Sequence, residues 1–294
     1  MAENRFHNKT VLVTGAARGI GAGVVRRLHG AGANVALVGL EPDLMRALAD
    51  ELGERTAVYE ADVTDLDALS AAAEGTANRF GGIDVAIANA GIAFVGALSS
   101  APVEHIERTL EVNLMGVWRT DRAVVPYLKE SKGYLLNIAS LAAVGHMPLM
   151  GAYTASKAGA EALTDALRME LRPDGVAVGC AYFGFIDTDL VRGAVEANPA
   201  GAAAYALAPS FLSKSIPVGK AVDAIEDGIE RRAERVWAPR FVGASLLTRG
   251  LVQPAVEFGI RLRRTGLVSA LSLADSHAAL NRQDPTLGAA AQSA

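Results

Sequence analysis

The chain has 294 residues, of which 51% are hydrophobic and 20% are charged, and it carries a formal net charge of −4. This composition excludes an intrinsically disordered chain, and a pI near 5.8 gives no basic excess for binding nucleic acid. A single cysteine, Cys180, excludes a disulfide framework, and the five histidines lack metal-ligand spacing, so neither a metal nor a nucleic-acid partner is expected.

Short runs rich in β-branched residues alternate with longer segments rich in Ala and Leu. The expected strands are Thr10–Thr14, Asn34–Val38, Thr56–Tyr59, Ile83–Ala88, Tyr134–Ala139 and Val176–Tyr182. The expected helices are Gly19–Gly30, Asp43–Leu52, Asp65–Phe80, Val103–Lys129 and Gly151–Leu171. Because the strands are almost entirely apolar, they are typical of a sheet buried on both faces. The alternation predicts a single α/β domain, with a parallel sheet between two layers of helices.

A glycine-rich turn directly follows the first expected strand. Gly15, Gly19 and Gly21 form the pattern G-x-x-x-G-x-G where that strand gives way to a helix. Glycine lets backbone N–H groups approach a phosphate, and the helix N-terminus adds a favourable dipole. This position predicts a dinucleotide site, and the alternative is a tight turn with a purely structural role.

The end of the second strand leaves the identity of the dinucleotide open. An acidic residue here normally binds the ribose of NAD, and a nearby basic residue accommodates the phosphate of NADP. Gly39 takes the usual acidic position and Leu40 the usual basic one. Arg18 could reach a 2′-phosphate, whereas Glu41 could bind a ribose or simply be solvated. After the third strand, Asp62 is expected to bond the adenine amino group or, alternatively, to cap the next helix.

Three residues that suit proton transfer come together in the expected fold. Tyr153 and Lys157 are four residues apart and therefore share one face of a helix. That spacing alone is common by chance, but Ser140 also stands at the end of the fifth strand, shortly before this helix. Reduction of a carbonyl needs a proton donor at the oxygen, and a phenol beside an ammonium group suits that task.

At this point the sequence resembles the short-chain dehydrogenase/reductase family. The motifs that carry the resemblance occur in the family's order and spacing, namely the Thr14–Gly21 turn, Asn89-Ala90-Gly91, Asn113, Ser140 and Tyr153-x-x-x-Lys157. The resemblance implies a Rossmann-like, doubly wound catalytic domain over residues 1–240, and hydride transfer between NAD or NADP and an alcohol or carbonyl compound. It also implies a homodimer or homotetramer built on Val103–Lys129 and Gly151–Leu171.

The expected roles combine side-chain chemistry with the resemblance. Tyr153 acts as general acid in reduction and as base in oxidation. Since free tyrosine titrates near 10, work at neutral pH requires a pKa lower by about 3, or roughly 4 kcal/mol. Lys157 and the positive nicotinamide are the charges able to lower it. Ser140 donates to the substrate oxygen and orients it, and by resemblance Asn113 holds a water that passes protons from Lys157 to solvent.

The cofactor is expected to extend from the glycine turn to the catalytic tyrosine. After the sixth strand the family usually has Pro-Gly; here Phe183-Gly184 keeps the tight turn but loses the fixed φ of proline. The backbone of Ile186 and the hydroxyl of Thr188 could still meet the carboxamide and the pyrophosphate. The full set of expected cofactor-binding residues is Gly15, Arg18, Gly19, Ile20, Gly21, Gly39, Leu40, Glu41, Asp62, Val63, Asn89, Ala90, Gly91, Tyr153, Lys157, Gly184, Ile186 and Thr188.

The expected substrate side of the site is apolar. Its predicted walls are Leu141, Val144, His146, Met147, Met150, Phe183, Phe185 and Leu190. Because these walls hold no Arg or Lys to fix a carboxylate or a phosphate, they favour a lipophilic secondary alcohol or its ketone as the substrate. The alternative function is that of a dinucleotide-binding regulator on the same fold. Loss of the tyrosine or the lysine is the usual mark of such a protein, and this sequence has both residues.

The sequence becomes less regular after the sixth strand. Phe185–Ser215 is rich in Ala, Pro and Ser, and a substrate lid and a plain surface loop are equally compatible with it. A helix is expected over Ala221–Arg232 and a short strand over Arg235–Ala238. The N-terminus lacks the apolar run of a signal peptide, and a cytoplasmic protein is therefore expected.

The extension over residues 241–294 mixes arginines with apolar side chains. Its most apolar stretch, Phe241–Ile260, is interrupted by Arg249, Pro254 and Glu257, so no membrane span is expected. The pattern suits a membrane surface, a neighbouring subunit or a cover over the site, and its acidic residues favour the last two. The final twenty residues, Asp275–Ala294, are expected to be disordered.

Overall fold

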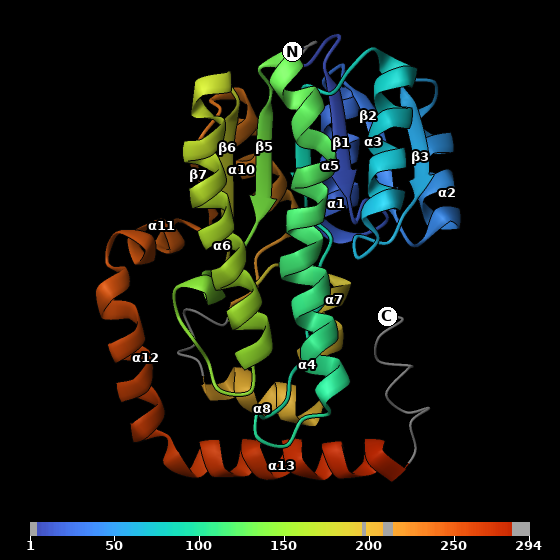
Figure 1. Cartoon of the computed structure of the whole chain (residues 1–294). Coiled ribbons are helices and arrows are strands. Elements are labelled where there is room, and N and C mark those ends of the chain that lie inside the picture. Colours follow the sequence, from blue (N-terminus) through green and yellow to red (C-terminus); the bar gives the residue numbers. More distant parts are fainter. Residues whose placement is uncertain (1–4, 196–197, 208–213, 284–294) are drawn as a thin grey trace.

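The computed structural model describes residues 5–195, 198–207 and 214–283. At its centre is a seven-stranded parallel sheet in the order β3-β2-β1-β4-β5-β6-β7 (Figure 1). The strands are β1 (Thr10–Thr14), β2 (Asn34–Gly39), β3 (Thr56–Glu60), β4 (Val85–Ala88), β5 (Tyr134–Ile138), β6 (Ala177–Phe183) and β7 (Arg235–Ala238). The order reverses between β1 and β4, which defines a doubly wound, Rossmann-like fold and confirms the predicted fold class.

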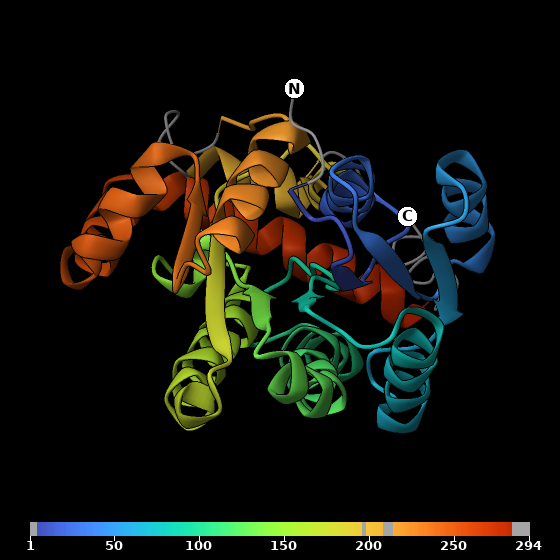
Figure 2. The ribbon, with the colours of Figure 1, turned by 90° about the horizontal axis from the view of Figure 1, so that it is seen from above.

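Helices cover both faces of the sheet, as the view from above shows (Figure 2). One face carries α1 (Gly19–Gly30), α2 (Pro42–Leu52) and α10 (Val218–Glu230). The other face carries α3 (Leu66–Phe80), α5 (Gly116–Ser131) and α6 (Gly151–Leu171).

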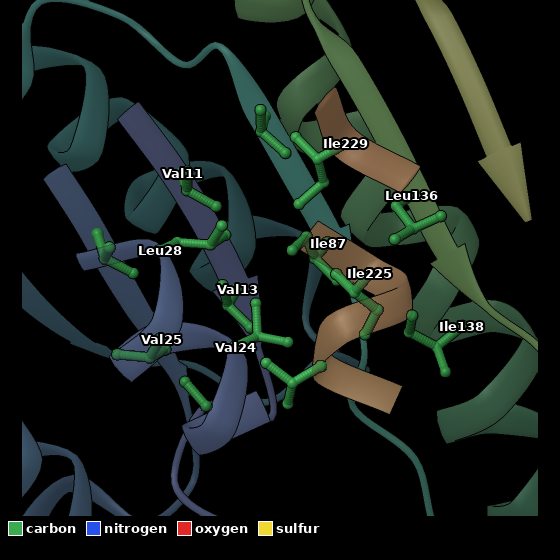
Figure 3. Packing of buried hydrophobic residues seen from close by; sticks show 14 of the residues in the cluster. Val11, Val13, Val24, Val25, Leu28, Ile87, Leu136, Ile138, Ile225 and Ile229 are labelled. Atoms are coloured by element: carbon green, nitrogen blue, oxygen red, sulfur yellow. The ribbon is translucent and has the colours of Figure 1, made fainter. Parts of the chain in front are cut away.

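Neighbouring residues of one strand serve opposite faces of the sheet. Val11 and Val13 pack in the cluster formed with α1 and α10, which Figure 3 shows from close by, whereas Leu12 between them packs in the cluster formed with α3 and α5. Side chains alternate along a strand, so a strand with two buried faces must be apolar at every position. This explains the continuous apolar runs in the sequence.

The segment between β4 and β5 contains a π turn that was not expected. Instead of one helix, α4 (Val103–Leu110) passes into η1 (Glu111–Met115), and α5 follows directly. A π turn widens the helix by one residue per turn and is frequent at functional sites. Asn113 stands at the centre of this one.

Two helices lie in the segment after β6, where a lid or a loop was expected. They are α7 (Asp189–Val195) and α8 (Pro199–Leu207). Pro199 is the first residue of α8, a position at which the missing N–H costs nothing because no intrahelical partner exists there. Ahead of α7, Ile186 is held by an isolated parallel bridge to Ile216.

The extension forms three helices, α11 (Arg240–Leu247), α12 (Arg249–Leu262) and α13 (Arg264–Gln283). Figure 1 shows α13 running past α8, and the two helices share an apolar cluster. The expected disorder from Asp275 onward is wrong as far as Gln283, because α13 continues to that residue. Residues 284–294 lie outside the described part of the chain. Within the described ranges, no helix has the length and apolar character needed to span a bilayer.

Candidate active site

A cavity of about 970 Å³ lies at the carboxyl ends of β1, β4, β5 and β6. In open α/β sheets, ligands bind at this edge where the strand order reverses. Most of the predicted cofactor and catalytic residues line the cavity. They are Gly15, Arg18, Gly19, Ile20, Leu40, Glu41, Asn89, Ala90, Gly91, Ser140, Tyr153, Lys157, Gly184, Ile186 and Thr188.

The turn after β1 has room for glycine only at two of its positions. A Cβ on Gly15, whose φ is +63°, would lie 2.8 Å from the Cα of Ala90, and a Cβ on Gly21 would lie 2.1 Å from the carbonyl oxygen of Gly15. The N-cap residue of α1, Arg18, has a side chain that cannot accept a hydrogen bond, so it does not cap the first N–H groups of this helix. These donors, at the positive end of the helix dipole, fit the pyrophosphate of a dinucleotide.

Asn89 fastens this turn to the end of β4. Its side-chain amide donates to the carbonyl oxygens of Thr14 and Gly15 at 3.0 and 3.1 Å, and its backbone N–H donates to the Thr14 hydroxyl at 3.0 Å. On the other side of the turn, a methyl group of Thr188 lies 3.3 Å from the position of a Cβ on Gly19. The structure thus places Thr188 beside the expected phosphate site.

Charged pairs mark the far end of the cavity. Arg18 Nε donates to Glu41 Oε1 at 2.5 Å, so the two candidates for recognising the ribose or its phosphate contact each other. Asp62 pairs with Arg108 at 3.0 Å. Burial opposes ionisation of Asp62, but hydrogen bonds from Thr64 and Arg108 outweigh it and lower its pKa. The helix cap considered for Asp62 is provided by Asp65, which accepts from two N–H groups of α3.

Three residues predicted to bind the cofactor pack behind the residues that line the cavity. Gly21 packs on Gly15, Gly39 lies against the side chain of Met45, and Val63 packs against Gly116 of α5. None of the three is among the lining residues in the described part of the chain. The structure shows close packing for these three residues, and their contact with a cofactor remains a prediction.

Ser140, Tyr153 and Lys157 converge at the other end of the cavity. Lys157 Nζ donates to the carbonyl oxygen of Ile138 at 2.8 Å and lies 5.8 Å from the centre of the Tyr153 ring. Burial lowers the pKa of Lys157 to about 8. Desolvation also raises the pKa of Tyr153, although its hydrogen bond with Ser140 opposes this. The low pKa expected for this tyrosine is therefore not a property of the protein groups alone.

Ser140 is both a structural cap and a member of the site. Its Oγ accepts the backbone N–H of Ala142 at 3.1 Å, which caps a short 3₁₀ turn, η2 (Leu141–Ala143). The same hydroxyl donates a long hydrogen bond, at 3.4 Å, to the carbonyl oxygen of Phe183. Donation to a substrate oxygen would replace this weak bond. The cap fixes the hydroxyl at the end of β5, beside Tyr153.

Asn113 is buried in the π turn and braces the chain that follows β4. Its Oδ1 accepts from the N–H of Ile92 and its Nδ2 donates to the carbonyl of Ile92, both at 2.8 Å. Nδ2 also lies 3.2 Å from Ser156 Oγ. The side chain thus holds Gly91 and Ile92 at the cavity wall, and the predicted water-holding role remains a prediction.

Most of the residues predicted to form the substrate wall do not line the cavity. Only Phe183 and Leu190 of that set line it. The others turn to different neighbours because helices of the extension and α8 pack on their loops. Leu141 and Val144 pack against α11, and Met147 belongs to the apolar cluster of α8 and α13. Met150 is the N-cap residue of α6, and Phe185 packs edge-on against Tyr205. The backbone N–H of His146 donates to the side chain of Gln253.

The observed wall comes from two segments whose role was missed. The stretch after Gly91 and the α7–α8 region supply Ile92, Ala93, Phe94, Val95, Val191, Ala194 and Asn198. Phe94 stacks on His105 of α4, with ring centres 4.8 Å apart. The sequence signal available was the apolar run after Asn89-Ala90-Gly91, which continues from the cofactor motif into the same cleft.

Two arginines, Arg18 and Arg108, also line the cavity, and each is paired with a carboxylate.

The fold, the glycine turn and the Ser–Tyr–Lys group together define a dinucleotide-binding oxidoreductase of the Rossmann-like class. Residues 9–199 match the sequence profile of the short chain dehydrogenase family, and the chain belongs to that family.

Several known proteins resemble the chain. A trans-4-hydroxycyclohexanecarboxylate dehydrogenase from Sinomonas cyclohexanicum is 35% identical over 65% of this chain and 77% of the relative. A 3-alpha-(or 20-beta)-hydroxysteroid dehydrogenase from Mycobacterium bovis is 34% identical over 63% and 72%. Among solved structures, an alcohol dehydrogenase from Thermococcus sibiricus, complexed with 5-hydroxy-NADP, is 27% identical with a TM-score of 0.68, covering 78% of this chain and 95% of the other.

Proposed function

We propose that the protein interconverts a lipophilic secondary alcohol and its ketone by hydride transfer with NAD or NADP. The observation that carries this proposal is the single cavity that joins the glycine turn at one end to Ser140, Tyr153 and Lys157 at the other. A bound dinucleotide accounts for the first end and proton transfer for the second. The similarity to an alcohol dehydrogenase complexed with an NADP derivative supports the same assignment.

The glycine turn and the N-terminus of α1 would hold the pyrophosphate, and Lys157 would hold the ribose next to the nicotinamide. When bound, the nicotinamide supplies the hydride to the carbonyl carbon in reduction, or takes it from the alcohol in oxidation. The residues of the chain then handle the proton. Tyr153 donates to the carbonyl oxygen, and Ser140 donates a hydrogen bond that orients that oxygen.

Lys157 acts on this proton transfer through its charge. Because the protein groups, Lys157 included, leave the pKa of Tyr153 raised, the positive charge of the oxidised nicotinamide has to add to that of Lys157 to stabilise the phenolate. Reduction starts from a protonated tyrosine, which the raised pKa favours. Oxidation needs the phenolate and is expected to gain from the positive charge of the oxidised nicotinamide.

The substrate is expected to be apolar and neutral. Ile92, Phe94, Val95 and Val191 give the observed wall, and the arginines of the cavity are already paired. A relative named as a hydroxysteroid dehydrogenase is consistent with a bulky apolar alcohol. A panel of cyclic and steroid ketones, 3-oxoacyl thioesters and sugars tests this point, and a preference for the thioesters or sugars contradicts it.

The central experiment separates cofactor binding from catalysis. NADH and NADPH are titrated separately by nicotinamide fluorescence, and turnover of the ketone panel is then followed with the cofactor that binds. Tyr153→Phe is expected to keep binding and to lose about 10²–10⁴-fold in kcat, because general acid catalysis contributes that much. Tyr127→Phe, on α5 and away from the cavity, serves as the control. Binding without turnover of any substrate would favour the non-catalytic regulator.

We also propose a homo-oligomer built on α4, α5 and α6. Trp118 on α5 and Met169 on α6 are exposed apolar side chains on these helices, which supports an interface there. Sedimentation velocity of the wild type and of Met169→Glu tests this, since a charge in the interface is expected to produce smaller species.

A further inference from the structure

The outer side of α12 carries an exposed row of large apolar side chains. Leu247, at the end of α11, and Leu251, Phe258 and Leu262 of α12 are 86, 71, 65 and 73% exposed. Within α12, steps of three and four residues keep Leu251, Phe258 and Leu262 on one face, and exposed Pro254 and Ala255 fill the interval between them. Leu247 precedes this row as the last residue of the separate helix α11. These four large residues are called the apolar ridge below.

The opposite face of α12 is fixed to the body of the protein, which sets the direction of the ridge. Val252 and Val256 lie against Gly145, in the loop after β5. Arg249 makes two hydrogen bonds to the buried carboxylate of Glu161 on α6, at 2.9 and 3.0 Å. Figure 1 shows α12 at the side of the molecule, away from the sheet. The ridge therefore points outward in the folded chain.

The charge of this region is opposite to that of the whole chain. Residues 240–264 contain five arginines and one acidic residue, Glu257, whereas the complete chain has a net charge of −4. Arg261, Arg263 and Arg264 lie close together in sequence at the corner between α12 and α13 and are all exposed. Arg261 lies 3.9 Å from Glu257, Arg263 donates to the carbonyl oxygen of Leu207, and Arg264 has no ion pair among the described residues. A helix with Leu and Phe on one side and arginines beside them is the pattern of an interfacial helix.

We propose that the ridge, with the arginines beside it, docks on an anionic lipid surface. The leucines and the phenylalanine enter the boundary between headgroups and acyl chains, and the arginines pair with lipid phosphates. A helix of 14 residues is about 21 Å long, shorter than the roughly 30 Å hydrocarbon core, so α12 lies along the surface.

Charge complementarity favours lipid over a second copy of the chain. If two ridges paired about a twofold axis, each residue would meet the equivalent patch of its partner. The paired patches would then bring together the arginines of both copies with Glu257 as the one acidic residue that each copy's residues 240–264 supply, and like charges gathered in one interface repel. An anionic membrane provides apolar and negative groups together, and the proposal does not depend on the reaction assigned above.

The test is flotation of the full-length protein with vesicles. One set is pure phosphatidylcholine, and in the other part of it is replaced by phosphatidylglycerol. Wild type is expected to float with the anionic vesicles and to be released by salt. Leu251→Ser combined with Phe258→Ser should reduce binding at least tenfold, about the effect of losing two buried apolar side chains. Arg261→Glu combined with Arg264→Glu should lose about fivefold per arginine removed.

Leu44→Ser, on exposed α2, is the matched control and should bind as the wild type does. Circular dichroism and NADH titration establish that each variant is folded. Failure of the wild type to bind anionic vesicles, or equal binding by the ridge variant, overturns the proposal. So does a ridge variant that sediments as a smaller species without lipid, since a second copy would then cover the ridge.

Discussion

The ion pair between Arg18 and Glu41 puts opposite charges side by side where the adenosine ribose is expected. Glu41 already neutralises Arg18, and its carboxylate would repel a 2′-phosphate. This arrangement favours a cofactor with free ribose hydroxyls, which a carboxylate can accept from. We therefore expect the pair, and not either residue alone, to set the choice between NAD and NADP.

Glu41→Gln should shift the cofactor preference toward NADPH. Removal of the carboxylate releases Arg18 and removes the repulsion, so the ratio of the NADPH to the NADH dissociation constant should fall by about tenfold, the effect of one charge-assisted bond. Fluorescence titration with both cofactors measures the ratio. Glu51→Gln breaks a similar exposed pair with Arg26, outside the cavity, and should leave the ratio unchanged. An unchanged ratio in Glu41→Gln would show that the pair does not select the cofactor.

A buried carboxyl in α5 makes stability depend on pH. Asn137 donates to Asp121 Oδ2 at 2.9 Å and to Thr164 Oγ1 at 3.0 Å, and burial raises the pKa of Asp121 to about 8. In the unfolded chain an aspartate titrates near 3.9. Between these pH values the folded state holds the extra proton. The stabilisation is therefore complete below about pH 4, falls progressively as the pH rises from about 4 to 8, and is fully lost above 8.

Asp121→Asn should remove much of this dependence, because an amide cannot ionise. From pH 5 to pH 8 the unfolding free energy of the wild type should fall by about 3 kcal/mol from this group, and that of the variant should fall less. Urea unfolding at both pH values provides the comparison. Asp43→Asn changes an exposed carboxyl and should follow the wild type. The same fall in Asp121→Asn as in the wild type would refute the account.

The reacting residues could be predicted because local geometry fixes them. Ser140 ends a strand, and Tyr153 and Lys157 share a helix face, so their convergence needs only the order of the elements. The substrate wall could not be predicted in this way. Which way the loop after Ser140 faces depends on α11 and α12, which cover Val144 and bind the backbone of His146.

At the scale of elements, α13 supports α8 from behind. Ala270 and Ala274 of α13 share a buried cluster with Ala200 and Ala204 of α8, and small side chains allow the two helices to approach closely. Val95, which lines the cavity, belongs to the same cluster. The extension therefore contributes to the substrate side without lining it.

Ala270→Asp should weaken substrate binding and spare cofactor binding. A charge at this fully buried position loosens α13 from α8, because a carboxylate there has no partner. KM for the ketone should rise about tenfold, as expected for a displacement of the wall, while the dissociation constant for NADH stays the same. Ser269→Asp, next to it on the exposed side, is the control. A KM unchanged in Ala270→Asp would separate α13 from the site.

The strands and the helices up to α6 could be predicted from the sequence, whereas the helices after β6 could be predicted less well. Apolar runs and helix-edge prolines give β1 to α6 within about two residues. Pro199 and the many alanines after β6 fit a loop as well as a helix, and only packing on α13 decides between them. The π turn at Asn113 was not predicted, because a π turn of five residues adds too little to the sequence pattern to be told from the α-helices on either side of it.

At the scale of the whole molecule, two large apolar clusters on opposite faces of one sheet form the stable part. α12 has no buried side chain, whereas β1, β4 and β5 are buried throughout. Opening of α12 therefore exposes little apolar surface, and its main cost is the separation of Arg249 from the buried carboxylate of Glu161. The central strands have no such route to local opening, because they are buried along their whole length.

Hydrogen exchange should show this difference directly. Backbone amides of α12 are expected to exchange by local opening, at least about 10²-fold faster than those of β1, β4 and β5, which exchange only on global unfolding. Mass spectrometry of peptic peptides gives both rates in one experiment. The rates of α10, a buried helix on the sheet, should follow the strands. Equal protection of α12 and the strands would mean that α12 unfolds together with the core.

The contact between α13 and α8 also bears on the order in which the site is assembled during synthesis. A chain translated as far as β7 already has the whole sheet, the glycine turn and the Ser140, Tyr153 and Lys157 side chains. The helix that holds α8 in place is still missing at that stage. A nascent chain is therefore able to form the cofactor end of its cavity before the substrate end is closed.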